Sequence, residues 1–95
     1  MNSYARRALR YWQNNLPRQY AQISNPEKFF ATMGETMAEQ INTLATQMEG
    51  PDDPNETFLD KLGRLNRVRT EAEHTVMGEM LPEPETSDPV AVASN

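Results

Sequence analysis

The sequence predicts an all-α protein built on a long antiparallel helical hairpin, with a shorter N-terminal helix and a disordered C-terminal tail. Two helix starts that contain proline, Asn25-Pro26 and Asp53-Pro54, each open a stretch with apolar residues at helical spacing. Between these stretches, Gly50-Pro51 ends the first helix and prevents its continuation. Since only about four residues connect the two helices, we expect them to lie side by side and antiparallel.

A shorter helix is predicted at the start of the chain, over residues 3–15, with Ser3 as its N-cap. One broad arc of this helix carries the large apolar and aromatic residues Tyr4, Ala8, Tyr11, Trp12 and Leu16. Pro17 cannot continue the hydrogen-bond ladder of the helix, so the chain must bend or restart there. A further short turn is expected before Asn25.

The second helix is predicted over residues 26–49. Asn25 supplies the N-cap, Pro26 suits the first helical position, and Glu27 complements the positive end of the helix dipole. Its apolar stripe consists of Phe30, Met33, Met37, Ile41, Leu44 and Met48. Because these residues recur at steps of three and four, they share one face of the helix, which we expect to meet the third helix.

The third helix is predicted over residues 54–81. Asp53 and Glu56 have the spacing of a capping box, with aspartate in place of the usual serine or threonine. Its apolar stripe consists of Phe58, Leu62, Leu65, Ala72, Val76 and Met80, flanked by Leu59 and Val68. The matching stripes of the two long helices predict an apolar seam between them.

Arg69 interrupts the apolar stripe of the third helix. A hairpin register with its turn centred near Pro51 places Arg69 opposite Gly34, where the missing side chain leaves room for the arginine stem. Two interpretations remain open. Either the stem packs in the seam and its guanidinium reaches solvent, or Arg69 binds a carboxylate of another chain.

The 95 residues allow one small helical domain over residues 1–81. Residues 82–89 contain three prolines, three acids and no large apolar side chain, so a disordered acidic tail is expected over 82–95. The chain has no cysteine, which excludes a disulfide scaffold and a thiolate metal site. It also has no apolar run long enough for a membrane span or a secretory signal, so we expect a cytoplasmic protein.

Charge is strongly segregated along the chain. Residues 1–23 carry four arginines and no acid, whereas residues 24–60 carry eight acids and one lysine. Such blocks indicate either docking of opposite charges within the chain or a basic arm for an anionic partner.

The third helix contains one pattern with metal-binding spacing, the pair Glu71 and His74. In ferritin-like di-iron proteins a Glu-x-x-His pair binds one metal, and Glu35 and Glu39 on the second helix could bridge the two ions of a dimeric site. Helical periodicity argues against this site, because Glu71 and His74 point away from the apolar stripe. They share that outer face with two i, i+4 ion pairs, Asp60–Arg64 and Arg67–Glu71, as a solvated face does.

The first helix combines arginines with aromatic residues, which indicates a site for a partner. Arg6, Arg7 and Arg10 lie within about two turns of one another. With Tyr11, Trp12 and Arg69, they form the predicted partner-binding set. Arginine and aromatic side chains also bind single-stranded nucleic acid, but the acidic remainder of the chain disfavours that partner.

A set of residues over roughly positions 5 to 81 resembles small helical proteins of actinobacterial phages and mobile elements. The pattern comprises Asn25-Pro26-Glu27, Phe29-Phe30, Gly63-Arg64-Leu65-Asn66, Arg69, Ala72-Glu73 and Glu79. That family has no established activity, so the resemblance implies a setting, the bacterial host cell or the virion, and no mechanism. Positions 71 and 74 are not expected to hold a metal ligand in it.

The sequence as a whole predicts a non-enzymatic helical interaction module that binds a protein partner or assembles with itself. Its single histidine has no positioned partner for acid–base catalysis, and no catalytic residue, metal or cofactor is expected. Nucleic acid is an unlikely partner on these grounds, and no membrane contact is expected. The dimeric ferritin-like protein and the nucleic-acid accessory protein remain the alternatives.

Overall fold

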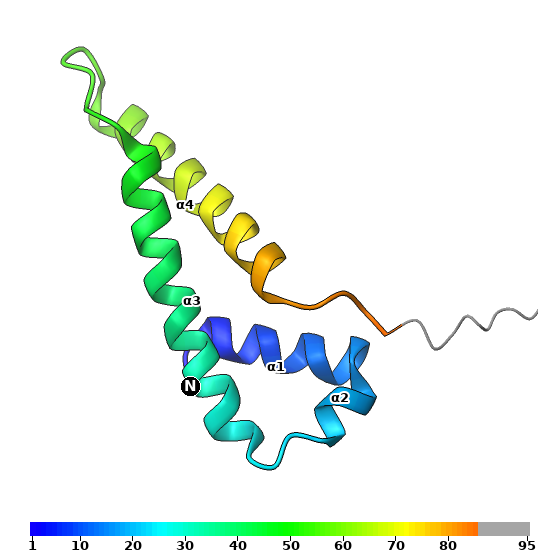
Figure 1. Ribbon diagram of the computed structural model, residues 1–95. Coiled ribbons are helices and arrows are strands. Elements are labelled where there is room, and N and C mark those ends of the chain that lie inside the picture. Colours follow the sequence, from blue (N-terminus) through cyan, green and yellow to red (C-terminus); the bar gives the residue numbers. More distant parts are fainter. Residues whose placement is uncertain (86–95) are drawn as a thin grey trace, which may run out of the picture. The chain divides into compact units, whose positions relative to one another are not determined.

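The computed structural model describes residues 1–85, which form four helices and no strand, so the predicted all-α class is confirmed (Figure 1). The helices are α1 (Ser3–Asn15), α2 (Pro17–Ala21), α3 (Pro26–Glu49) and α4 (Phe58–Met80). Residues 86–95, which belong to the predicted tail, lie outside the described residues.

The chain divides into two compact units, each with its own internal contacts. Within the described residues, unit 1 comprises residues 1–35 and 81–85, and unit 2 comprises residues 36–80. Unit 1 therefore holds α1, α2 and the first part of α3, and unit 2 holds the remainder of α3 and all of α4.

Helix α1 has the predicted bounds, but its N-cap is Asn2 and not Ser3. The side-chain oxygen of Asn2 accepts a hydrogen bond from the backbone N–H of Ala5 at 2.8 Å. Asn2 also donates its side-chain N–H to the carbonyl oxygen of Gly34 in α3, at 3.0 Å. One amide side chain thus caps the start of α1 and attaches it to α3.

Gly34 lets α1 approach α3 closely. A β-carbon at this position would lie 2.6 Å from the β-carbon of Ala5 and 2.8 Å from its backbone nitrogen. Those distances are too short for any side chain, so α1 occupies the space that glycine leaves open. The predicted use of that space, to hold the stem of Arg69, is therefore wrong.

Aromatic rings fill the interior of unit 1. The ring of Trp12 packs edge-on against Phe29 and Phe30, with centroids 5.4 and 5.6 Å apart, and Tyr20 of α2 stacks on Phe30 at 6.2 Å. These are the distances at which aromatic pairs attract one another. Leu16, at the junction of α1 and α2, is completely buried.

Residues 82–85 do not behave as the first part of a disordered tail. The hydroxyl of Tyr11 donates a hydrogen bond to the carbonyl of Pro82 at 2.7 Å. The backbone N–H of Glu85 donates to the carbonyl of Asn15 at 2.9 Å, and its carboxylate accepts from the N–H groups of Arg18 and Gln19. The acidic residue at position 85 therefore supplies acceptors for the start of α2, which the prediction from composition did not foresee.

The predicted bounds of α3 are confirmed. Asn25 caps its start by accepting from the N–H of Lys28 at 3.2 Å. At its end, Gly50 adopts a positive φ of 67°, the left-handed conformation in which glycine commonly stops a helix.

The start of α4 was predicted too early. The helix begins at Phe58, and the hydroxyl of Thr57 caps it by accepting from the N–H of Asp60 at 3.0 Å. Asp53 does not cap a helix; its side chain accepts from Asn55 at 2.9 Å and so forms a turn. The connection therefore runs over residues 50–57, eight residues in place of the expected four.

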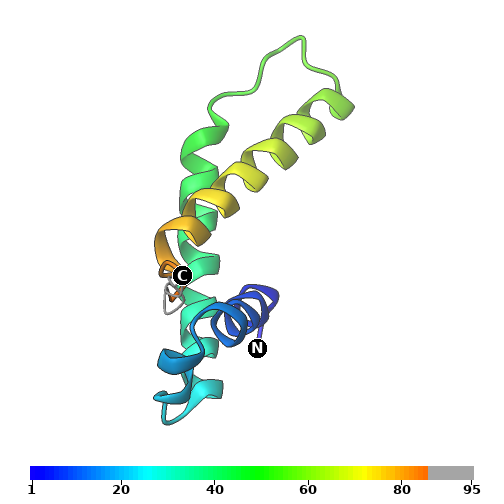
Figure 2. The same ribbon diagram turned by 90° about the vertical axis from the view of Figure 1, so that its right-hand side faces the viewer.

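The seam predicted between the long helices is buried over only part of its length. The buried residues of unit 2 are Met37, Ile41, Ala45, Ala72, Val76 and Met77. Figure 2 shows α3 and α4 separating toward the loop. Phe58 and Leu62, which the prediction placed in the seam, are accordingly exposed. The predicted antiparallel hairpin is thus not confirmed.

Candidate interaction surfaces

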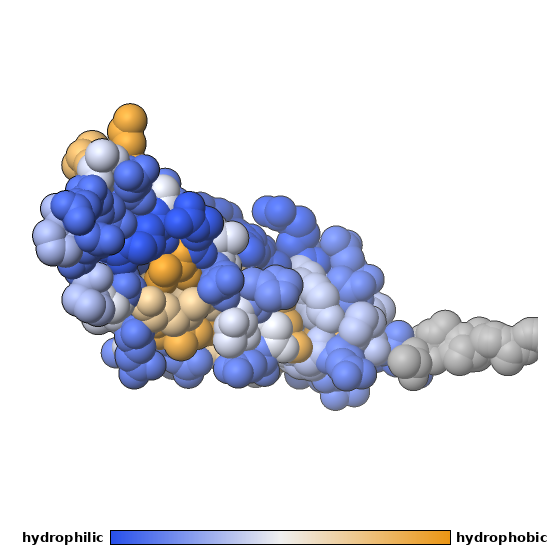
Figure 3. Space-filling view, turned by 90° about the horizontal axis from the view of Figure 1, so that it is seen from above, coloured by the Kyte–Doolittle hydropathy of each residue, from blue (hydrophilic) through white to orange (hydrophobic). Residues whose placement is uncertain are grey.

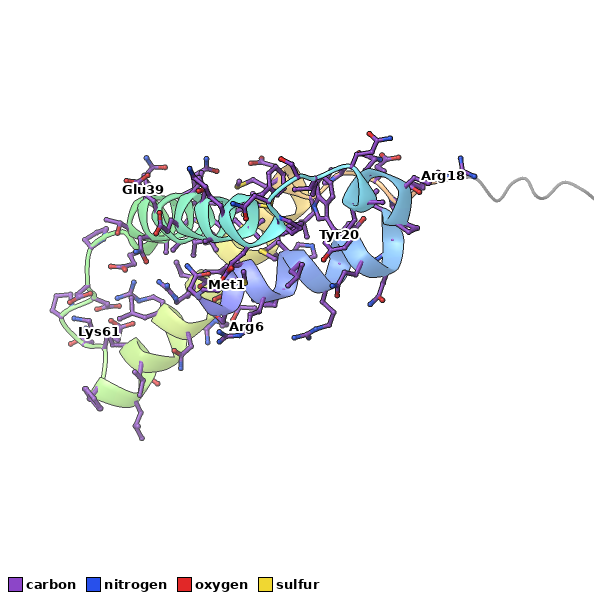
Figure 4. All side chains as sticks on the ribbon, turned by 90° about the horizontal axis from the view of Figure 1, so that it is seen from below. Met1, Arg6, Arg18, Tyr20, Glu39 and Lys61 are labelled. Carbon is purple, nitrogen blue, oxygen red and sulfur yellow. The ribbon has the colours of Figure 1, made fainter. Side chains whose placement is uncertain are left out.

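The three arginines predicted on the first helix lie at the surface of α1. Figure 4 shows Arg6 beside Met1, and its guanidinium donates to the carbonyl of Met1 at 2.7 Å. Arg7 lies over the ring of Tyr4, 5.8 Å from the centroid, within the range of a cation–π interaction. Arg10 is exposed as well. The basic face of α1 (Arg6, Arg7 and Arg10) is therefore accessible to solvent.

The two aromatic residues predicted to contact a partner are held inside unit 1. Trp12 is only 8% exposed, and the half-buried Tyr11 uses its hydroxyl to bind Pro82. The indole N–H of Trp12 is buried and has no hydrogen-bond partner among the described residues. The ring of Trp12 is therefore not open for stacking on a base, as the nucleic-acid alternative would require of it.

A charge network fixes the loop of unit 2. Arg64 of α4 donates to both carboxylate oxygens of Glu56, at 2.8 and 3.1 Å, and to Asp52 at 2.7 Å. It also donates to the carbonyl of Glu49, at the end of α3, at 2.7 Å. Lys61 forms an ion pair of 2.6 Å with the second oxygen of Asp52. Arg64 thus ties the last turn of α3 to the loop, and the predicted pair Asp60–Arg64 is not formed.

The pKa values of the network follow from these contacts. Hydrogen bonds from Lys61, and next from Arg64, lower the pKa of Asp52 below its ordinary value of 3.8. The same bond to Asp52 raises the pKa of Lys61. The bond to Glu56 is the largest cause of the raised pKa of Arg64. Each of these shifts favours the charged form of its group.

The side chain of Arg69 contacts residues of unit 2 and does not occupy the space beside Gly34. Its guanidinium donates to the side-chain oxygen of Asn42 in α3 at 2.9 Å, and it lies 4.0 Å from Glu73, four residues further along α4. Arg69 therefore joins the two long helices by a polar contact. Arg64 makes a further bond between these helices, to the carbonyl of Glu49.

The residues of the alternative metal site are all at the surface. Glu35, Glu39, Glu71 and His74 have exposed side chains. Over residues 1–85, no group of three or more histidine, aspartate or glutamate side chains is arranged to hold a metal ion.

The most exposed large apolar residues belong to the first turns of α4. Phe58 is 77% exposed, Leu59 75% and Leu62 44%, and these three residues form the apolar end of α4. Seen from the loop side in Figure 3, hydrophobic side chains stand at the surface of this part of unit 2. Periodicity placed two of these residues on a common stripe, but it gave no sign that α3 leaves them uncovered.

Hollows open on the surface of unit 2. One, of about 420 Å³, lies between α3 and α4 and is lined by Glu39, Gln40, Thr43, Leu44, Gln47, Val76 and Glu79. Another, of about 360 Å³, lies on the outer side of α4 alone and is lined by Asn66, Arg67, Thr70 and Glu71.

The chain was compared with protein-family models, with curated proteins and with solved structures, and none of them matches it. None of the helices within residues 1–85 combines the length and the apolar character that crossing a membrane requires.

Proposed function

We propose that the protein is a non-enzymatic helical interaction module whose main contact surface is the apolar end of α4. The observation that carries the proposal is the exposure of Phe58, Leu59 and Leu62 on adjacent turns of one helix. Covering a large apolar side chain is worth roughly 1.5–3 kcal/mol, so three neighbouring ones provide a substantial driving force for association.

The frame of this surface is an antiparallel hairpin of α3 and α4, which the Arg69–Asn42 and Arg64–Glu49 bonds support. The charge network around Arg64 holds the loop, and the loop in turn presents the first turn of α4. The resemblance to proteins of phages and mobile elements supports a setting in a bacterial host cytoplasm or on a virion.

Photo-crosslinking in an actinobacterial host tests the proposal. A photoreactive phenylalanine analogue replaces Leu59 in the full chain, and a control chain carries it at Thr75, an exposed polar position on the same helix. We expect position 59 to give one discrete protein adduct, identified by mass spectrometry, that position 75 does not give. We also expect the adduct to disappear when Leu62→Asp is added, because a charge opposes burial of this surface.

The Leu62→Asp chain must keep its helical circular dichroism for that comparison, and the exposure of Leu62 makes this the expected result. An adduct at position 59 that also forms at position 75, or that survives the Leu62→Asp change, would overturn the proposed contact surface.

The basic face of α1 is a second candidate surface, for an acidic protein partner. Arg6, Arg7 and Arg10 are exposed on a helix whose opposite side is buried. Changing all three to Gln should leave thermal unfolding nearly unchanged and should weaken a partner complex in a salt-dependent way. If the triple variant unfolds instead, these arginines have a structural role, and the second candidate fails.

A further inference from the structure

The outer face of α4 has the features that two copies of one helix need in order to pair. At about 100° per residue, Leu59, Gly63, Asn66, Arg67 and Thr70 fall within an arc of about 100°. Leu59 projects from this face, and the hollow lined by Asn66, Arg67, Thr70 and Glu71 opens on it. A projection and a hollow on the same side of one helix make the face complementary to itself.

From this arrangement we propose that a second copy of the chain is the partner, and that the two α4 helices pair antiparallel about a two-fold axis between Gly63 and Arg64. In such a pair, residue i of one copy faces residue 127 − i of the other. Leu59 then lies at the level of residue 68 of the other copy, between Asn66 and Thr70, which line the hollow. The inference rests on the proposed function and names its partner.

The charges on this face fit the same register. The residue numbers of Asp60 and Arg67 sum to 127, so each Asp60 faces the Arg67 of the other copy. One symmetric contact therefore contains two opposite-charge pairs. Within the described residues, the carboxylate of Asp60 and the guanidinium of Arg67 form no ion pair of their own. The guanidinium of Arg67 lies 3.6 Å from the place that a β-carbon of Gly63 would occupy, and so close to the proposed axis.

Gly63 lies where the helices would be nearest. A residue without a side chain at the axis permits close contact of the two backbones, as small residues do at helix crossings. A methyl group at Gly63 would meet only the end of Arg67, at an ordinary contact distance, so an alanine fits within one copy. The glycine is therefore not required by its own chain, and the proposed dimer gives it a role.

Two glycine substitutions separate the dimer from the fold. Gly63→Ala and Gly78→Ala each replace a helical glycine of α4, and each should raise helix stability, by roughly 0.5–1 kcal/mol. Gly78 lies far from the proposed axis and is the matched control. Sedimentation equilibrium on the full chain should show a dimer, and Gly63→Ala should raise its Kd about tenfold, a change that Gly78→Ala should not cause.

Charge exchange tests the register. Asp60→Arg and Arg67→Asp each place like charges opposite one another across the axis, so each should weaken the dimer by about tenfold or more. The double variant restores opposite charges in the exchanged order and should recover most of the affinity. If the double variant is no tighter than the single ones, the antiparallel register is wrong.

A chain that stays monomeric at all concentrations overturns the inference. The crosslinked product then distinguishes the two proposals. A discrete adduct from Leu59 to another protein leaves the interaction module intact and rejects self-pairing, whereas the absence of any specific adduct rejects both. An adduct between two copies, lost in Leu62→Asp, supports both.

Discussion

The two units of this chain use their apolar residues in different ways. In unit 1, Phe30 is completely buried among aromatic rings, and α1 lies close enough to α3 to require glycine at position 34. In unit 2, an equally large residue, Phe58, stands in solvent at the start of α4, and polar contacts of Arg64 fix the adjoining loop. Unit 1 closes its interior with its own side chains, while unit 2 leaves a hydrophobic surface open.

This difference implies that the residues that stabilise the fold and the residues that bind a partner lie in different units. Close packing of rings and backbones stabilises a single arrangement, and a change of even one methyl group there is felt. An exposed apolar end contributes little to folding and is available for association. Substitutions in unit 1 should therefore lower the free energy of unfolding, and those at the apolar end of α4 should act on assembly.

The difference between the two units is tested most directly by replacing one phenylalanine of each unit with alanine. Phe30→Ala should lower the free energy of unfolding by about 3–5 kcal/mol, because it removes a completely buried ring. Phe58→Ala should change it by no more than about 0.5 kcal/mol in the dissociated chain, since that ring is mostly exposed already. Urea unfolding followed by circular dichroism, at concentrations low enough for dissociation, measures both. Equal losses in the two variants would show that Phe58 contributes as much to folding as Phe30 does.

The next largest effect on stability is expected where α1 lies close to α3 in unit 1. Gly34→Ala should destabilise the chain by about 1–3 kcal/mol, because the added methyl collides with Ala5, including its backbone nitrogen. Gly78→Ala meets nothing within 4 Å and is the control, expected to be stabilising. Thermal unfolding of both variants would measure the difference. A Gly34→Ala chain as stable as the original would show that α1 does not lie against α3.

The parts of this structure that the sequence predicts are those fixed by near neighbours. The bounds of α3 follow from Asn25 and Gly50, which act within a few residues of the helix ends. The start of α4 could not be predicted in this way. Asp53 has the capping pattern but its side chain closes a turn, and Glu56, the expected second member of the capping box, binds Arg64 eight residues further on.

The spacing of residues predicted the basic face of α1 and which residues belong to each apolar stripe. It did not predict which of the stripe residues are buried. Whether Phe58 is covered depends on how far α4 separates from α3, which no local pattern records. The approach of α1 to Gly34 joins positions 32 residues apart, and a glycine in a helix gives no sign of what will lie against it.

A smaller effect concerns pH and the loop of unit 2. The lowered pKa of Asp52 means that its contribution to stability is present above about pH 4 and is lost as the pH falls through the lowered value. The contribution of Lys61 to stability is complete below pH 10.5 and is lost as the pH rises through the raised pKa of Lys61. We therefore expect the loop amides, measured by hydrogen exchange, to lose protection in acid before the helices do.

In an Asp52→Asn chain the acid-dependent step should disappear, whereas Glu79→Gln, which changes an exposed carboxylate outside the network, should keep it. A loop that responds to acid equally in both variants would show that Asp52 is not the group responsible.

The smallest expected effect concerns the one buried side-chain nitrogen or oxygen that lacks a hydrogen-bond partner among the described residues, in the interior of unit 1. The indole N–H of Trp12 is buried without an acceptor, and a buried donor left unpaired costs about 1–3 kcal/mol. Trp12→Phe removes this donor and keeps an aromatic ring against Phe29 and Phe30, so the lost contact area and the removed penalty should nearly cancel. We expect the free energy of unfolding to change by less than about 1 kcal/mol, whereas Trp12→Ala should cost about 3–5 kcal/mol. A large loss in the phenylalanine variant would mean that the N–H does find an acceptor in solution, and that this acceptor contributes to the structure of unit 1.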